Sequence, residues 1–367
     1  VNALTATGWR PTFTAGFTAN CAPSEVSTGD RNTPYSLFPG LYVLDIATGG
    51  LRLIDDQRGQ VFFGASGNSF DWSPTGDRLA IAEGRSGADI YRSTGTHERH
   101  LAVTAFSADW LNDGRIALGV EQGDRSGFAF ADPASGTVGG FMPRDSFGGA
   151  WSPDGRYLAE ARQSYDDRSG LYILDRLTGG ERRVAAGEFF YTTWSPDGTR
   201  LAAFRSSATG GDLVVFDAAS GAELALYPNA GQDFAWSPDG RWIAMTAWPG
   251  NPEDASSIIL VAADGSSSRT LTQGQHPSWS PDSGLVSFVR DGELWIIPAS
   301  GVGAESPLVR PQLPSIAEAK WSPTGMAIAF RVRGGESGVH VIGVQGGGER
   351  YLAPGFNPQW APTGNRI

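Results

Sequence analysis

The five residues Trp194-Ser195-Pro196-Asp197-Gly198 recur along the chain with small changes, and this recurrence decides the fold. Related motifs begin at Trp72, Trp110, Trp151, Trp236, Trp279, Trp321 and Trp360. Successive tryptophans are 38 to 43 residues apart. Proline sets φ to about −65° at the first central turn position, and glycine supplies the left-handed conformation that closes a hairpin. Each motif therefore predicts a tight turn between two strands, repeated at a regular period.

Each motif is followed by two further strand patterns. A short apolar strand comes directly after the turn, as in Arg156-Tyr157-Leu158-Ala159. A second hairpin then recurs, as in Leu171 to Asp175 followed by Thr178-Gly179-Gly180. Two hairpins make four antiparallel strands per repeat, and radially stacked four-stranded units of this size are the blades of a β-propeller.

The two ends of the chain carry complementary halves of a repeat. The hairpin at Leu41 to Leu53 precedes every tryptophan motif, whereas the motif at Trp360 has no second hairpin after it. We therefore predict an all-β, closed eight-bladed β-propeller in which N- and C-terminal strands share the closing blade. Residues 10–18 are an alternative source of the second strand of that blade. The predicted domains are an N-terminal extension, 1–40, and the propeller, 41–367.

Composition limits the partners and the compartment. The net charge of −11 opposes binding to nucleic acid. The single cysteine, Cys21, excludes a disulfide within the chain, and no run of 18 apolar residues predicts membrane insertion. The chain begins at Val1 without an initiator methionine, so we expect a processed mature form or an excised piece of a longer chain. We expect a bacterial periplasmic or extracellular protein whose signal peptide has been removed. We also expect a monomer.

The tryptophan turns, the strands after them and the Leu-Tyr-Val-Leu-Asp hairpin at residues 41–45 resemble the TolB-type propeller repeat. The resemblance covers residues 41 to 367 and implies a propeller. It implies less about function, because this repeat occurs in periplasmic scaffold proteins, in lyases of pectin fragments and in the gating propellers of prolyl oligopeptidase-like enzymes. TolB itself has six blades and an N-terminal α/β domain, which this sequence does not show.

If each motif tryptophan ends the innermost strand of a blade, the residue three positions earlier lies near the mouth of the central channel. Around the ring this position holds Ser69, Ser107, Gly148, Tyr191, Asp233, His276, Glu318 and Asn357. Carboxylates, an imidazole and an amide oxygen are suitable ligands for calcium or a transition metal. The alternative, a water-filled polar channel, is the one we favour, and the metal stays unknown.

Arginines recur eleven residues after the tryptophan, at Arg162, Arg205 and Arg290. They predict either a clamp for a carboxylate or sulfate or a set of salt bridges between blades. The motif tryptophans themselves recur in every repeat, which indicates packing between blades. Trp248 lies outside the motif and is the best candidate for an exposed aromatic contact.

The sequence contains no Gly-x-Ser-x-Gly nucleophile elbow, and His97 and His100 lie in a predicted hairpin where no helix presents them to a metal. We therefore expect no enzyme and no cofactor, but a binding or scaffold propeller of the cell envelope or a secreted one. It would present one face and its channel mouth to a protein, peptide or glycan partner. The alternative is a metal-dependent lyase or hydrolase acting on an anionic saccharide at the channel mouth, centred on Asp233, His276 and Glu318.

Overall fold

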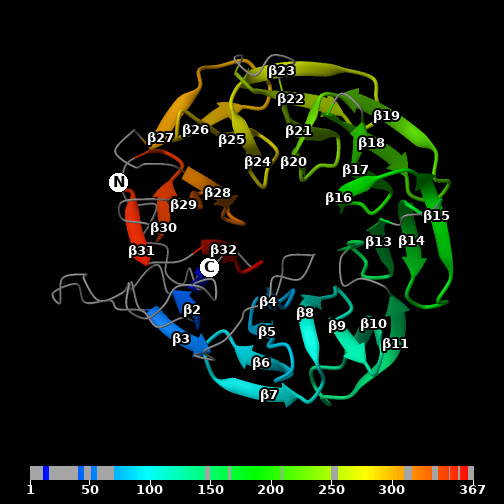
Figure 1. The fold of residues 1–367 in the computed structure, drawn as a ribbon. Coiled ribbons are helices and arrows are strands. Elements are labelled where there is room, and N and C mark those ends of the chain that lie inside the picture. The colour runs from blue at the N-terminus through cyan, green and yellow to red at the C-terminus, as the bar shows by residue number, and fades with distance from the viewer. Residues whose placement is uncertain are drawn as a thin grey trace, which may run out of the picture.

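A computed structural model shows that the chain is built from β-strands arranged around an open centre (Figure 1). It describes residues 11–15, 40–44, 51–55, 70–144, 149–163, 167–207, 210–248, 255–309, 316–332, 338–346, 348–353 and 356–362. Within these ranges, no helix is long and apolar enough to cross a membrane.

The strands form eight four-stranded antiparallel sheets. Three sheets contain β4 (Phe70–Trp72), β5 (Arg78–Ala82), β6 (Ala88–Arg92) and β7 (His97–Leu101); β8 (Ala105–Trp110), β9 (Ile116–Gln122), β10 (Arg125–Ala131) and β11 (Val138–Arg144); and β12 (Ala150–Trp151), β13 (Tyr157–Arg162), β14 (Gly170–Asp175) and β15 (Glu181–Ala186). Two more contain β16 (Phe189–Trp194), β17 (Arg200–Ser207), β18 (Gly210–Asp217) and β19 (Glu223–Pro228); and β20 (Ala230–Trp236), β21 (Trp242–Ala247), β22 (Ser257–Ala262) and β23 (Ser268–Gln273). The next two contain β24 (Gln275–Trp279), β25 (Leu285–Arg290), β26 (Glu293–Pro298) and β27 (Ser306–Val309); and β28 (Ile316–Trp321), β29 (Ala327–Val332), β30 (Gly338–Gly343) and β31 (Arg350–Ala353). The last contains β3 (Leu51–Asp55), β2 (Gly40–Leu44), β1 (Pro11–Ala15) and β32 (Phe356–Trp360), in that order.

This arrangement corrects the prediction of an eight-bladed propeller built from one repeat. Seven blades, from β4 to β31, each contain four consecutive strands. The remaining sheet is not another copy of them, because β32 pairs with β1, a strand that precedes the first repeat, and β1 pairs with β2. N- and C-terminal strands do pair in this composite sheet, but the predicted eight-bladed closed propeller is wrong, because the repeat builds seven blades.

The composite sheet contacts the blades on both of its sides. Val43 of β2 and Ala361, directly after β32, are buried in one cluster with Phe70 and Trp72 of the first blade. On the other side, the indole Nε1 of Trp360 donates a hydrogen bond to the backbone oxygen of Lys320, 2.9 Å away. The composite sheet therefore lies between the first and the last of the seven blades.

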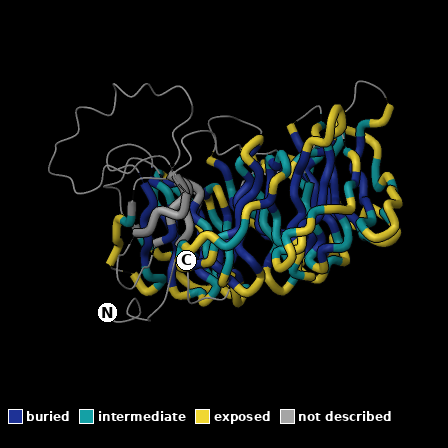
Figure 2. Tube along the Cα trace, turned by 90° about the horizontal axis from the view of Figure 1, so that it is seen from below, coloured by how far each residue is buried: buried dark blue, intermediate teal, exposed yellow. Residues whose placement is uncertain are grey.

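The tryptophan turn follows from its own side chains. Ser195 Oγ donates to Asp197 Oδ1 at 2.6 Å and accepts from the backbone N of Arg200 at 2.9 Å, across the hairpin. Gly198 has a φ of 70°, which a residue with a side chain rarely adopts. We call the face of the ring that carries these turns the turn face, and the opposite face, where each innermost strand begins, the mouth face. Buried residues occupy the strand interiors, whereas exposed ones gather at both faces (Figure 2).

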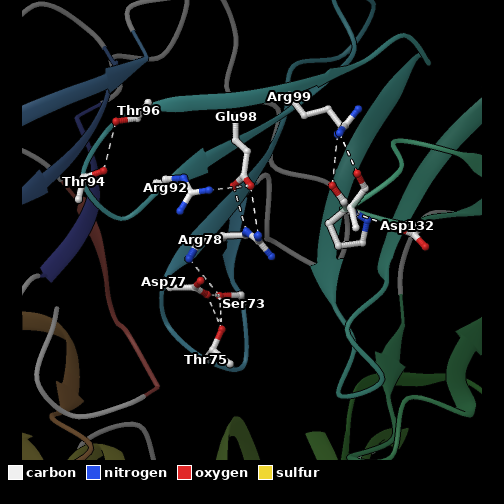
Figure 3. A network of polar contacts seen from close by, with 12 residues as sticks. Ser73, Thr75, Asp77, Arg78, Arg92, Thr94, Thr96, Glu98, Arg99 and Asp132 are labelled. Carbon is white, nitrogen blue, oxygen red and sulfur yellow. Dashed lines mark hydrogen bonds and ion pairs between the residues drawn. The ribbon is translucent and has the colours of Figure 1, made fainter.

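Arginines of the outer strands bind the turn of the next blade. Arg99 of β7 donates to the backbone oxygens of Pro133, Ala134 and Ser135, which form the β10–β11 turn (Figure 3). Further along the ring, Arg182 of β15 donates in the same way to the oxygen of Ala218. These contacts join neighbouring blades at their outer edges, where the blades diverge.

Candidate functional site

Three of the predicted site residues lie on innermost strands of consecutive blades, around the open centre of the ring (Figure 1). Tyr191 lies on β16, Asp233 on β20 and His276 on β24. In each strand the pairing register shifts around that residue. Tyr191 and His276 have φ values of 47° and 55°, a conformation that costs a residue with a side chain on the order of 1–3 kcal/mol and is enriched at functional sites.

Two of these residues meet across a blade boundary. His276 Nδ1 lies 2.9 Å from Asp233 Oδ2, and the side chains are 47% and 45% exposed. The sequence prediction grouped Glu318 and Asn357 with this pair. Their backbones lie on the innermost strands β28 and β32, but their side chains lie outside the described part of the chain. Among the residues that are described, no group of three or more His, Cys, Asp or Glu side chains is arranged to hold a metal ion.

The three predicted arginines are paired inside their own blades. Arg162 contacts Glu181 at 2.7 Å, Arg205 contacts Glu223 at 3.3 Å, and Arg290 contacts Glu305 at 2.7 Å. In each case the partner belongs to the outer-strand region of the same blade, so the alternative prediction of salt bridges between blades is wrong for these pairs. A carboxylate ligand would have to compete with these partners for the guanidinium groups.

The pair formed by Arg162 is strengthened by its surroundings. Arg162 also contacts Glu160 at 2.9 Å, and its guanidinium carbon lies 4.2 Å from the ring centre of Tyr172. The Arg162 guanidinium lowers the pKa of the Glu181 carboxyl from its ordinary value. This arginine thus joins strands of its own sheet.

Trp248, which the sequence predicted to be an exposed aromatic contact, lies on the mouth face. Its backbone N donates to the oxygen of Asn229, directly before the innermost strand β20, and 51% of the residue is exposed. A Cβ atom added to Gly231 would lie 2.5 Å from Trp248 Nε1. The indole therefore lies against the innermost strand, and the missing side chain of Gly231 makes room for it.

Sequence reasoning missed two acidic residues of the innermost strands. Asp71 accepts from the backbone N of Trp72 at 2.9 Å and, across the blade boundary, from that of Trp110 at 2.8 Å. Burial raises the pKa of Asp71 to about 7, against the opposing effect of these two hydrogen bonds. Burial also raises the pKa of Asp109 to about 8, and the nearby charge of Asp71 adds to the shift. The signal was visible only as an aspartate directly before two of the motif tryptophans.

His97 and His100 share one carboxylate. Asp89 Oδ1 lies 2.8 Å from His97 Nε2 and 3.1 Å from His100 Nδ1. Asp89 is on β6 and the two histidines are on β7, the outer strand of the blade. The two histidines lie in a hairpin, as the sequence predicted, but the shared aspartate was not foreseen, because it lies eight residues before His97.

Comparison with known proteins shows the fold. No family model and no curated protein matches this chain. Among solved structures, dipeptidyl peptidase 4 from Porphyromonas gingivalis matches with 13% identity and a TM-score of 0.60, over 82% of this chain and 55% of that one. Oligogalacturonate lyase in complex with manganese matches with 14% identity and a TM-score of 0.52, over 72% of this chain and 84% of that one.

TolB from Acinetobacter baumannii also matches, with 15% identity over 88% of this chain and 79% of that one. Its TM-score of 0.39 is too low to support a shared fold. At these identities the comparisons establish an all-β propeller. The TolB-type character of the repeat stays a prediction from the tryptophan motifs.

Proposed function

We propose that this chain is a noncatalytic binding or scaffold propeller that presents its mouth face to a protein, peptide or glycan partner. The observation that carries the proposal is the pair of exposed aromatic residues on neighbouring blades of that face. Tyr191 is 59% exposed and Trp248 is 51% exposed. Exposed tyrosine and tryptophan are the residues that most often anchor a binding surface, because they contribute large contact area at low entropic cost.

Polar groups beside the aromatic residues would give the surface its specificity. Asp233 and His276 lie on the adjacent innermost strands and are about half exposed. A carboxylate and an imidazole can accept and donate hydrogen bonds to hydroxyl groups or to peptide groups. We place this function in the bacterial cell envelope or outside the cell.

An immobilised array of oligosaccharides and short peptides tests the proposal. We expect at least one class of ligand to bind, and Tyr191→Ala and Trp248→Ala each to weaken that binding about tenfold, as loss of an interface aromatic commonly does. Val302→Ala is the matched control, because Val302 is 81% exposed but lies in the β26–β27 turn on the turn face. Binding that is unchanged in both aromatic variants would overturn the proposal.

The contact between His276 and Asp233 favours a second candidate, a metal-dependent lyase or hydrolase acting on an anionic saccharide. A histidine held by a carboxylate is a common arrangement for a metal ligand or a general base. Calorimetric titration with calcium and with manganese separates the two candidates. Stoichiometric binding that is lost in Asp233→Ala would favour the enzyme, whereas no binding would leave the scaffold.

A further inference from the structure

A pocket of about 700 Å³ opens between two blades on the turn face, away from the channel mouth. One blade contributes Tyr157 and Ile173, and the next contributes Trp194 and Ala218. Asp175 and Asp217 also line the pocket, each at the end of the strand before a hairpin turn. The volume and the mixture of aromatic walls with a few charged groups are those of a ligand site.

The preceding blade boundary shows why the pocket is open. There, Arg176 fills the equivalent space: its guanidinium carbon lies 5.2 Å from the ring centre of Phe130, and Nη2 lies 2.6 Å from Asp113 Oδ2. Arg176 N donates to Arg156 O and Ala218 N donates to Thr199 O, both at 2.9 Å, so the two residues occupy the same position in successive blades.

Alanine at position 218 therefore leaves vacant the space that an arginine fills one blade earlier. Phe130, the ring that contacts Arg176, has its counterpart in Ile173, because each lies two residues before the aspartate that ends its hairpin strand. Asp113 has its counterpart in Asp154, the fourth residue of the Trp151 motif. Asp154 Oδ1 accepts from Ser152 Oγ and from Arg156 N.

Three carboxylates line the pocket, those of Asp175, Glu181 and Asp217, against one guanidinium, that of Arg182, which donates to the backbone oxygen of Ala218. The Asp175 pKa is lowered to about 2, chiefly by its hydrogen bond with Arg156, and the Asp217 pKa is lowered by its hydrogen bonds with Ser220. Both carboxyl groups are therefore ionised at neutral pH. Tyr157 and Trp194 form the apolar wall of the pocket. Their rings stack on each other, and the guanidinium carbon of Arg156 already lies 4.9 Å from the ring centre of Tyr157.

We propose that this pocket binds an arginine side chain presented by an extended segment of a partner protein. The incoming guanidinium takes the place that the chain's own Arg176 takes at the preceding boundary, with Asp217 as its counter-ion, because Asp175 is already paired with Arg156 at 2.7 Å. Leu177, 67% exposed in the β14–β15 turn between Asp175 and Gly180 at the pocket edge, offers an apolar contact for the residue beside the arginine. The net charge of −11 favours approach of a basic partner.

The test is binding of the peptide acetyl-Leu-Arg-Leu-amide, measured by calorimetry against the same peptide with citrulline in place of arginine. Citrulline keeps the shape but removes the charge, so we expect at least tenfold weaker binding. In the protein, Ala218→Arg should fill the pocket as Arg176 does and reduce binding of the arginine peptide at least tenfold. Ala218→Ser is the matched control and should bind within twofold of the unchanged protein.

Thermal unfolding shows whether each variant is folded. Asp217→Asn is a second variant whose result does not depend on whether Ala218→Arg folds. It should weaken binding of the arginine peptide severalfold while leaving the citrulline peptide unaffected. Equal binding of the two peptides, no binding at millimolar concentration, or unchanged binding in a folded Ala218→Arg protein would each overturn the proposal. None of these results depends on the mouth face, so the test is independent of the proposed function.

Discussion

The indole Nε1 of Trp194 donates a hydrogen bond to the backbone oxygen of Ala150, 2.8 Å away in the preceding blade. Trp279 makes the equivalent bond to Ala235 at 3.0 Å. In both cases the acceptor directly precedes the tryptophan of the blade before. Trp194 and Trp279 therefore join consecutive blades, in agreement with the packing between blades that the recurrence of the motif predicted.

Trp194→Ala should destabilise the protein by about 3–5 kcal/mol, since it removes a buried aromatic side chain. Trp194 is 7% exposed, belongs to a buried cluster between two blades and stacks on Tyr157 with ring centres 6.4 Å apart. Urea unfolding measures the change. Trp248→Ala is the control, because that indole is 51% exposed and should cost far less. Similar losses in the two variants would contradict the assigned burial.

Gly136→Ala should destabilise the outer edge of the ring more than Gly114→Ala does. Both glycines have positive φ, 75° and 84°, so both variants carry the same strain of about 1–2 kcal/mol. Only at Gly136 would the new Cβ lie 2.8 Å from an atom of Arg99, the arginine that binds the β10–β11 turn (Figure 3).

Thermal unfolding of these variants, with and without Arg99→Ala, separates the two effects. The excess cost of Gly136→Ala should disappear when Arg99 is absent, because the colliding side chain has been removed. An excess cost that persists would show that the arginine is not its cause.

The half-buried residues Asp71 and Asp109 should make the protein less stable as pH rises. Their folded pKa values, about 7 and about 8, lie above the ordinary value of 3.8, so the folded state binds more protons than the unfolded state between these limits. The free energy of unfolding should therefore be highest near pH 4 and fall, by on the order of a few kcal/mol, as pH rises to 8.

Asp109→Asn removes one ionisable group while preserving its shape. The variant should be more stable than the unchanged protein at pH 8 and should show a weaker fall between pH 5 and 8. Asp217→Asn is the control, because the Asp217 pKa is lowered rather than raised and its loss should not flatten this part of the curve. An Asp109→Asn protein with the same pH dependence as the unchanged one would contradict the assigned shift.

The sequence predicted the architecture because the fold depends on local chemistry. A Ser-Pro-Asp-Gly turn closes a hairpin wherever it occurs, and a period near 42 residues fits one blade. The composite sheet depends instead on which strand pairs with β32. That strand is β1, and the pairing joins residues more than 340 positions apart, such as Pro11 and Trp360. β1 lies within residues 10–18, the stretch that the sequence offered as an alternative source of a strand in this sheet.

The site was less predictable, because it depends on what each side chain contacts. Alignment of the repeats placed Asp233 beside His276 correctly, since equivalent positions of adjacent blades are neighbours. The same alignment could not show that Arg205 turns to Glu223 of its own blade. Nor could it reveal the pocket at Ala218. An alanine in a turn indicates open space only when its position is compared with that of Arg176 in the preceding blade.

Asp233→Ala should leave the stability of the protein almost unchanged. Asp233 is 45% exposed, and its contact with His276 is an exposed pair, which contributes about 0–1 kcal/mol. Urea unfolding beside Trp194→Ala gives the comparison within one chain, since both residues lie on innermost strands but differ in burial. A loss in Asp233→Ala as large as that in Trp194→Ala would mean that Asp233 is packed into the ring, and the mouth face would then lack the polar group that the proposed binding surface requires.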